Sequence, residues 1–206
     1  MQDMKRQIKD LKIDYLSPVS GKISLERAWD YMIRNKVKAL PVIDEEQSYI
    51  GMVTMEEITK VYTRGISDKD IYELEVPLEN IIHTLRATLT GEKKKEVRLK
   101  DVKIQSLKET KEINIGSKDT TIITPYHPKT IQRILIRCIP VQYILESKVQ
   151  TSFHMSENIK KAEEKARKTD ARYFAVLRQE DIPVGVIERE EILYQYQSKR
   201  KVKKAI

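Results

Sequence analysis

The chain has 206 residues, 40% of them hydrophobic and 34% charged, which is enough apolar material for the core of one domain or two small ones. Its 39 lysine and arginine residues exceed its 31 acidic residues, and the net charge of +8 raises the expectation of an anionic partner. No apolar run approaches the roughly 18 residues of a spanning helix, and the first ten residues hold no apolar signal core. The single cysteine, Cys138, excludes an internal disulfide framework. We expect a cytoplasmic protein with no membrane contact.

The first informative segment predicts the order helix, strand, turn, strand, helix. Ser24 is a suitable N-cap for a helix whose apolar residues recur at helical spacing. Two short apolar runs, 39–43 and 49–53, predict strands separated by a polar turn. Residues 54–57, Thr-Met-Glu-Glu, form a capping-box pattern that starts the second helix.

The same order returns near the C-terminus. Ser156 is expected to cap a helix, residues 173–177 and 184–187 to form strands, and 188–191 to start the last helix. Gly51 and Gly185 lie 134 positions apart, and 142–144 echoes 14–16. Each copy is too small to bury both faces of its sheet, so the two copies should pack together and leave clefts between them.

The region between the copies predicts mixed structure. Apolar residues at helical spacing indicate a helix over 77–89, and residues 96–123 alternate irregularly, as short strands do. A turn at 124–128 precedes another helix that leads to Pro140.

The duplicated pattern resembles a pair of cystathionine-β-synthase (CBS) domains. Within that class, residues 9–18, 38–44, 76–82 and 124–126 resemble the regulatory insert of the CBS-containing manganese-dependent (family II) inorganic pyrophosphatases. The resemblance implies an α+β fold, with two CBS repeats packed as a Bateman module around a pseudo-twofold and a short mixed middle segment. The resemblance divides the chain into a first CBS domain at 8–64, a middle region at 65–139, a second CBS domain at 140–198 and a basic tail at 199–206.

The family's insert binds adenine nucleotides, so the resemblance implies a regulatory ligand such as AMP, ADP, ATP or a diadenosine polyphosphate. It also implies a homodimer formed through the CBS domains and an attached or associated pyrophosphatase domain. Two features depart from the family. The middle region has no DRTGG-like stretch and is shortened. The catalytic metal motifs are also absent: His83, His127 and His154 each stand isolated, without a partner at metal-ligand spacing in the sequence. We therefore expect no catalytic residue, metal site or cofactor in this chain.

The resemblance places one nucleotide site in the first copy. Thr54 stands at the position of a hydroxyl near the phosphate, Glu57 at that of the acid on the ribose, and Ala39, Leu40 and Pro41 at that of the apolar backbone around the adenine. An acid suits ribose because it accepts protons from two hydroxyls. A plain helix cap accounts for Thr54 and Glu57 equally well.

In the second copy the corresponding candidates are Arg172, Tyr173, Ala175 and Glu191. Arginine pairs with phosphate in two-pronged fashion, and tyrosine stacks or hydrogen-bonds. An edge-strand arginine and a core tyrosine are the plain structural interpretation of the pair. Glu188 stands where the family has a serine-like hydroxyl, and its carboxylate would repel a phosphate.

Two alternatives to nucleotide sensing stay open. The pair could have lost its ligand and serve as a dimerising scaffold, which Glu188 favours. The lysine-rich tail beside Tyr194 and Tyr196 could bind nucleic acid, although the mixed charge of the rest of the chain makes this the third choice.

Overall fold

The computed structural model describes residues 6–64, 73–91, 95–106, 112–114, 120–145 and 151–194. These residues belong to two compact units. The first unit comprises Met1–Gly21, Asn35–Thr54 and Leu145–Ile206, and the second comprises Lys22–Arg34 and Met55–Ile144. The expected basic tail at 199–206 lies outside the described residues.

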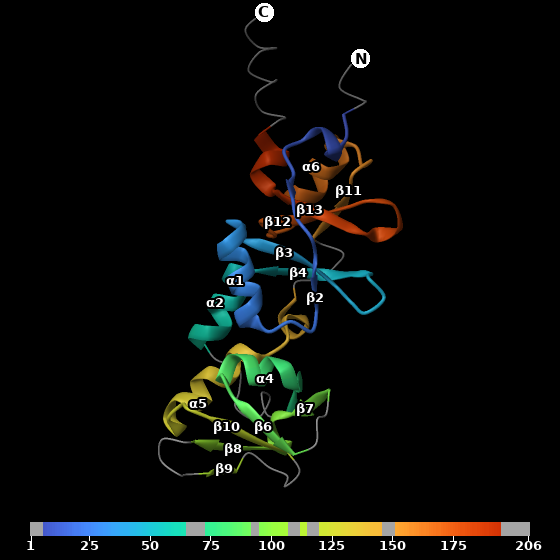
Figure 1. The fold of residues 1–206 in the computed structure, drawn as a ribbon. Helices are drawn as coiled ribbons and strands as arrows, with labels where there is room; N and C mark the ends of the chain where they lie inside the picture. The colour runs from blue at the N-terminus through green and yellow to red at the C-terminus, as the bar shows by residue number, and fades with distance from the viewer. Residues whose placement is uncertain are drawn as a thin grey trace, which may run out of the picture. The chain divides into compact units, whose positions relative to one another are not determined.

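Two sheets of the same design make up the first unit (Figure 1). One contains β2 (Val19–Ser20), β3 (Ala39–Ile43) and β4 (Tyr49–Thr54). The other contains β11 (Ser152–His154), β12 (Tyr173–Leu177) and β13 (Pro183–Glu188), with β1 (Asp14–Tyr15) added at its edge. In both, the first strand runs parallel to the second and the third runs antiparallel to it. The predicted strands and their repeat are confirmed.

The two copies agree residue by residue. Their pairing registers, Val19 with Val42 and Phe153 with Val176, differ by the same 134 positions as the two glycines. Both antiparallel pairs contain a bulge at the equivalent point, and both turns hold a non-glycine residue with positive φ, Gln47 at 65° and Asp181 at 58°. Such a conformation is uncommon outside glycine, so its recurrence at the same offset indicates a shared turn geometry.

The segment that leads into each copy docks on the start of the other copy's helix. In the first unit Ile8 donates its backbone N–H to Glu157 O (3.0 Å), and Ile159 donates to Arg6 O. In the second unit Val141 donates to Ile23 O (2.9 Å), in the same arrangement. Each leading segment contains a 3₁₀ turn: η2 (Ile8–Asp10) and η5 (Val141–Ile144).

This exchange corrects two expectations. Residues 142–144 are the counterpart of the η2 turn and not of Asp14–Leu16; at the offset of the repeat, the counterpart of β1 lies outside the described residues. Helix α6 (Ile159–Arg167) is capped by Asn158, whose side chain accepts from Lys160 N, rather than by Ser156. Ser24 acts as expected, since its Oγ accepts from Arg27 N at 3.2 Å.

Alternation along β12 divides its residues between two cores, because successive strand side chains point to opposite faces. Phe174 and Val176 face α6 and pack with Phe153 and the helix residue Ala162. Tyr173, Ala175 and Leu177 form the opposite face and share a second core with residues of the first copy's sheet: Ala39, Tyr49 and Met52. The sheets of the two copies therefore pack on each other within the first unit, as the repeat predicted.

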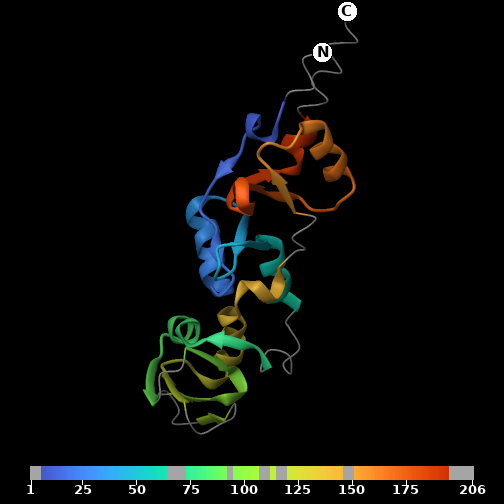
Figure 2. The same cartoon turned by 90° about the vertical axis from the view of Figure 1, so that its right-hand side faces the viewer.

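The second unit holds the remaining elements (Figure 2). Its helices are α1 (Leu25–Asn35), α2 (Met55–Arg64), α4 (Leu78–Leu85) and α5 (Pro128–Leu135). Its four-stranded sheet has the order β6 (Thr88–Gly91), β10 (Thr120–Thr124), β8 (Val102–Ser106), β9 (Glu112–Asn114), and a ribbon joins β5 (Glu75–Pro77) to β7 (Glu96–Arg98). Short 3₁₀ turns, η3 (Leu99–Asp101) and η4 (Ile136–Cys138), complete it.

The predicted helix over 77–89 is too long. It ends at Leu85 because Arg86 adopts a left-handed conformation, with φ of 47°, and the chain then enters β6. Early in α4, Asn80 is completely buried and donates its Nδ2 hydrogens to Lys22 O (2.9 Å) and Cys138 O (3.3 Å). This amide ties α4 to the segments on either side of it in the second unit.

The core between the two sheets contains one buried hydroxyl whose loss we expect to be measurable. Tyr49 Oη lies 3.2 Å from Thr151 O and 3.0 Å from Thr151 Oγ1, and Tyr49 is completely buried. Tyr49→Phe should lower the free energy of unfolding by about 1–2 kcal/mol, because a buried carbonyl loses a donor. Urea unfolding of the variant checks this, with the exposed Tyr15→Phe as the control; equal stabilities would contradict it.

Candidate functional site

The second copy's candidates lie on the face of its sheet that meets the first copy. Tyr173 and Ala175 are buried in the core between the sheets, where Ala39 also lies. Tyr173 pairs directly with Glu188, and Ala175 with Val186. Directly opposite residues of an antiparallel pair share a face, so the Glu188 side chain belongs to this face and is half-buried at its end.

In the first copy the equivalent positions are Ala39 and Thr54, which form a directly opposed pair. Thr54 is 6% exposed at the last position of β4. Pro41 lies on the same face, opposite Met52, whereas Leu40 points to the other face and is completely buried. Only the backbone of Leu40 is therefore available to a ligand between the sheets.

Register thus makes Thr54 and Glu188 structural equivalents. Each is the last residue of the third strand of its copy, and each directly precedes a helix. A hydroxyl in this place can donate to a phosphate beside the free amides of a helix N-terminus, and a carboxylate cannot. The two halves of the first unit have the same backbone and opposite preferences for an anion.

Arg172 is exposed and lies over the ring of Tyr173, with 5.5 Å between its guanidinium carbon and the ring centroid. Its own carbonyl accepts a hydrogen bond from Arg189 N at 2.8 Å. The cation–π contact orients the guanidinium against the aromatic ring. The pair Arg172–Tyr173 therefore combines a core tyrosine with a surface cation, as the plain structural interpretation has it, although β12 is a central strand and not an edge strand. The role of Arg172 toward a phosphate stays a prediction.

Glu57 is the third residue of α2 and belongs to the second unit. Its side chain is 16% exposed, and Lys60 Nζ lies 3.9 Å from its carboxylate and 2.9 Å from that of Glu56. The lysine partly balances the two acids on this turn of the helix.

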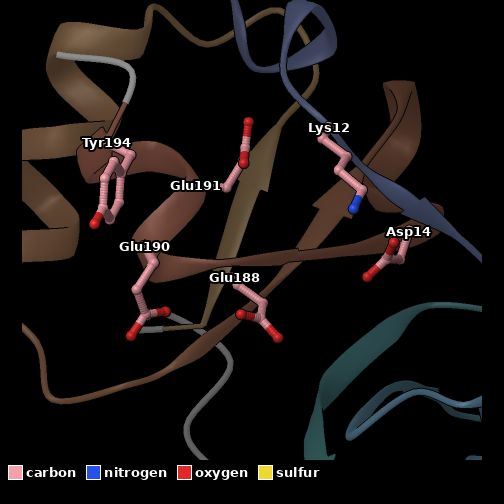
Figure 3. A pocket seen from close by; sticks show the side chains of 6 residues that line it. All are labelled: Lys12, Asp14, Glu188, Glu190, Glu191 and Tyr194. Carbon is pink, nitrogen blue, oxygen red and sulfur yellow. The ribbon is translucent and has the colours of Figure 1, made fainter. Parts of the chain in front are cut away.

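A cavity of about 270 Å³ opens beside Glu191 in the first unit (Figure 3). Its lining residues are Lys12, Asp14, Glu188, Glu190, Glu191 and Tyr194. The carboxylates of Glu188 and Glu190 lie on the same side, and that of Glu191 points the other way (Figure 3). Among the described residues that line it, four carboxylates face one ammonium group, so this part of the lining is acidic and opposes an anion.

Sequence reasoning identified Glu191 and Glu188 in this cavity and missed Lys12 and Asp14. Those two come from the segment before the first copy, which crosses to the second copy as β1.

Tyr194 is 71% exposed and lies among carboxylates, and this acidic surrounding does not favour the nucleic-acid surface that was expected at this tyrosine. Among the described residues, no three histidine, cysteine, aspartate or glutamate side chains are grouped so as to hold a metal ion. None of the described helices is both long and apolar enough to cross a membrane.

Comparison with known proteins identifies the repeat. Residues 8–64 match the CBS domain family. The second copy reproduces the topology and register of this domain at a constant offset. The family match thus covers the first copy, and the second copy shares its fold.

Among known proteins, a cobalt-dependent inorganic pyrophosphatase of Clostridium perfringens (strain 13 / Type A) is 24% identical over 190 residues. The match covers 70% of this chain and 35% of the relative, so the chain spans about a third of that protein's length.

Two solved structures share the fold. The CBS and DRTGG domains of the regulatory region of Clostridium perfringens pyrophosphatase, complexed with the activator diadenosine tetraphosphate, match with a TM-score of 0.70 and 19% identity. This match covers 89% of our chain and 100% of that one. The CBS domain of a CBS domain-containing membrane protein from Sphaerobacter thermophilus matches with a TM-score of 0.53 and 14% identity, covering 93% and 88% of the two chains. The α+β CBS-pair fold is confirmed.

The single cysteine of the chain, Cys138, belongs to the second unit and is completely buried in η4. Burial raises the pKa of its thiol to about 12, although the neighbouring Thr84 acts in the opposite direction. The thiol is therefore protonated near neutral pH, which marks a packing cysteine rather than a redox switch.

We expect iodoacetamide at pH 8 to label Cys138 at least roughly a hundredfold more slowly in the folded chain than in urea. Mass spectrometry of timed samples measures both rates. Equal rates in the folded and unfolded chain would show that the thiol is accessible and ionised.

Proposed function

We propose that the CBS pair binds an adenine nucleotide between the sheets of its two copies and acts as a regulatory module. The observation that carries the proposal is the matched pair of positions, Ala39–Thr54 and Tyr173–Glu188, on the facing sides of the two sheets. In the first copy a buried hydroxyl stands directly before a helix, and the N-terminus of a helix attracts a phosphate. The solved relative of the same fold is complexed with diadenosine tetraphosphate, which supports a ligand of this class.

The candidate residues have distinct roles in this proposal. Thr54 donates to a phosphate, and the backbone of Ala39, Leu40 and Pro41 lies against an adenine in the first copy. In the second copy Tyr173 and Ala175 provide the apolar wall, Arg172 approaches a phosphate from the surface, and Glu191 accepts from ribose hydroxyls. Glu57 is the corresponding acid of the first copy.

We further propose that the module regulates an inorganic pyrophosphatase that is attached to it or associated with it. The C. perfringens relative supports this, since its regulatory region matches this chain's fold along its whole length. On the same ground the middle region, 65–139, is proposed to be a shortened DRTGG-type domain.

We also propose that two copies of the chain dimerise through the CBS helices. Helix α1 carries Ile33, which is 55% exposed, and a second copy could cover it.

The first test is a calorimetric titration of the purified chain with AMP, ATP and diadenosine tetraphosphate. We expect micromolar binding, weakened roughly tenfold by Thr54→Ala because one hydrogen bond to a charged phosphate is lost. Thr59→Ala is the matched control, since Thr59 is exposed on α2 and its hydroxyl donates to Met55 O within the helix. Absence of heat and of thermal stabilisation at millimolar ligand would replace this proposal with the ligand-free scaffold.

A second prediction concerns the charge of the second copy. Glu188→Gln removes a half-buried carboxylate from the cavity and should strengthen binding of ATP roughly tenfold, while leaving adenosine almost unchanged. The gain should shrink as salt is added, because salt screens the repulsion. Glu164→Gln, on the exposed surface of α6, makes the same change of charge away from the cavity. Equal effects of the two variants on ATP would contradict the assignment.

A further inference from the structure

The N-terminal segment of the described chain, Arg6–Leu16, is bound to the second copy through its backbone and through buried apolar side chains. Ile8 and Lys9 donate to the carbonyls of Glu157 and Met155, each at 3.0 Å. Asp14 and Tyr15 then form the two-residue strand β1 against β13, and Leu16 donates to Val184 O at 3.3 Å. We call this segment the strap.

The side chains of the strap alternate between the core and the cavity. Ile8, Leu11 and Ile13 are buried in the core that β12 shares with α6. Between them, Lys12 and Asp14 are exposed on the other side and line the acidic cavity. One wall of the cavity is therefore made by the strap, and the rest by the second copy: Glu188, Glu190, Glu191 and Tyr194.

Gly185 permits this arrangement because the strap passes directly over it. A Cβ atom at this position would lie 2.6 Å from Asp14 O and 2.9 Å from Ile13 Cγ2. The nearest obstacle is backbone, which cannot move aside without breaking the short ladder of β1 and β13. The second copy thus has a strand edge adapted to an added strand at one point.

The charges of the cavity make the strap's position sensitive to an occupant. Lys12 is attracted by the carboxylates of the second copy, whereas Asp14 is repelled by them. The two-residue ladder, the backbone bonds and the buried side chains of Ile8, Leu11 and Ile13 together hold this segment. Local opening of such a segment costs more free energy than fraying of a chain end and less than global unfolding. The complete cavity exists only when the strap is docked, because the strap forms one of its walls. A ligand that contacts both walls therefore binds the docked state more tightly and favours it.

We propose that the strap is the element through which the second copy reports occupancy of its cavity by the nucleoside end of a ligand: binding there stabilises the docked strap, and release loosens it. This proposal rests on the nucleotide site of the preceding subsection and adds its coupling to the chain before the first copy. Lys12 is the positioning residue in this scheme, because it is the one cation among the described residues that line the cavity.

Hydrogen exchange of the 206-residue chain, with and without saturating diadenosine tetraphosphate or AMP, tests the coupling. We expect exchange at the amides of Ile8, Lys9 and Leu16 to slow roughly tenfold on binding, within the range of measured couplings between sites. Gly185→Ala should speed exchange of the strap in the absence of ligand and weaken binding by a similar factor.

Lys12→Ala provides a variant that leaves the backbone and the core unchanged. It should reduce the protection that ligand gives to the strap, whereas Lys9→Ala, the same loss of charge on the same strap outside the cavity lining, should not. Saturable binding with unchanged exchange of the strap would overturn the coupling and leave the nucleotide site intact. Absence of binding in calorimetry would remove both, and equal behaviour of the two lysine variants would exclude Lys12.

Discussion

The first unit depends on the crossing of the chain over Gly185. Because this residue has no side chain, the strap can lie close enough to β13 for β1 to form, and β1 completes a four-stranded sheet. The same crossing places Ile8 and Ile13 in the core beside α6 and carries Lys12 and Asp14 to the cavity. The packing of the strap against the core beside α6 and the charges that line the cavity therefore both depend on one close backbone contact.

The pseudo-symmetry of the pair is a symmetry of backbone and not of chemistry. Strand order, register, bulges and even the positive-φ turn residues repeat, since they satisfy the same hydrogen-bonding and packing requirements in both copies. These hydrogen-bonding and packing requirements do not fix the side chains at the strand ends. At that position the first copy has Thr54 and the second copy has Glu188. A ligand with one phosphorylated end and one nucleoside end would meet a donor in the first copy and acceptors in the second. The divergence at this position can thus set the orientation of a ligand without any change of fold.

Local patterns in the sequence predicted what local forces determine. Apolar runs such as 39–43 and 173–177 became strands, and the repeat predicted that they would face each other across a shared core. The helix over 77–89 was overextended because apolar spacing continues past Leu85, whereas a single left-handed residue, Arg86, ends the helix. The cap of α6 is Asn158 and not Ser156; both residue types are good caps, and the offset of 134 positions between the copies places Asn158 opposite Ser24.

The cavity lay beyond such prediction for a different reason. Lys12 and Asp14 are separated from Glu188 by more than 170 residues of sequence, and their polar alternation is equally typical of a solvated loop. Their place is decided by where the strap crosses, and the sequence signal for that crossing is Gly185, which the repeat alone explained as a copy of Gly51. In this chain the glycine of the second copy accommodates the added strand, and that strand connects the charge of the cavity to the segment that leads into the pair.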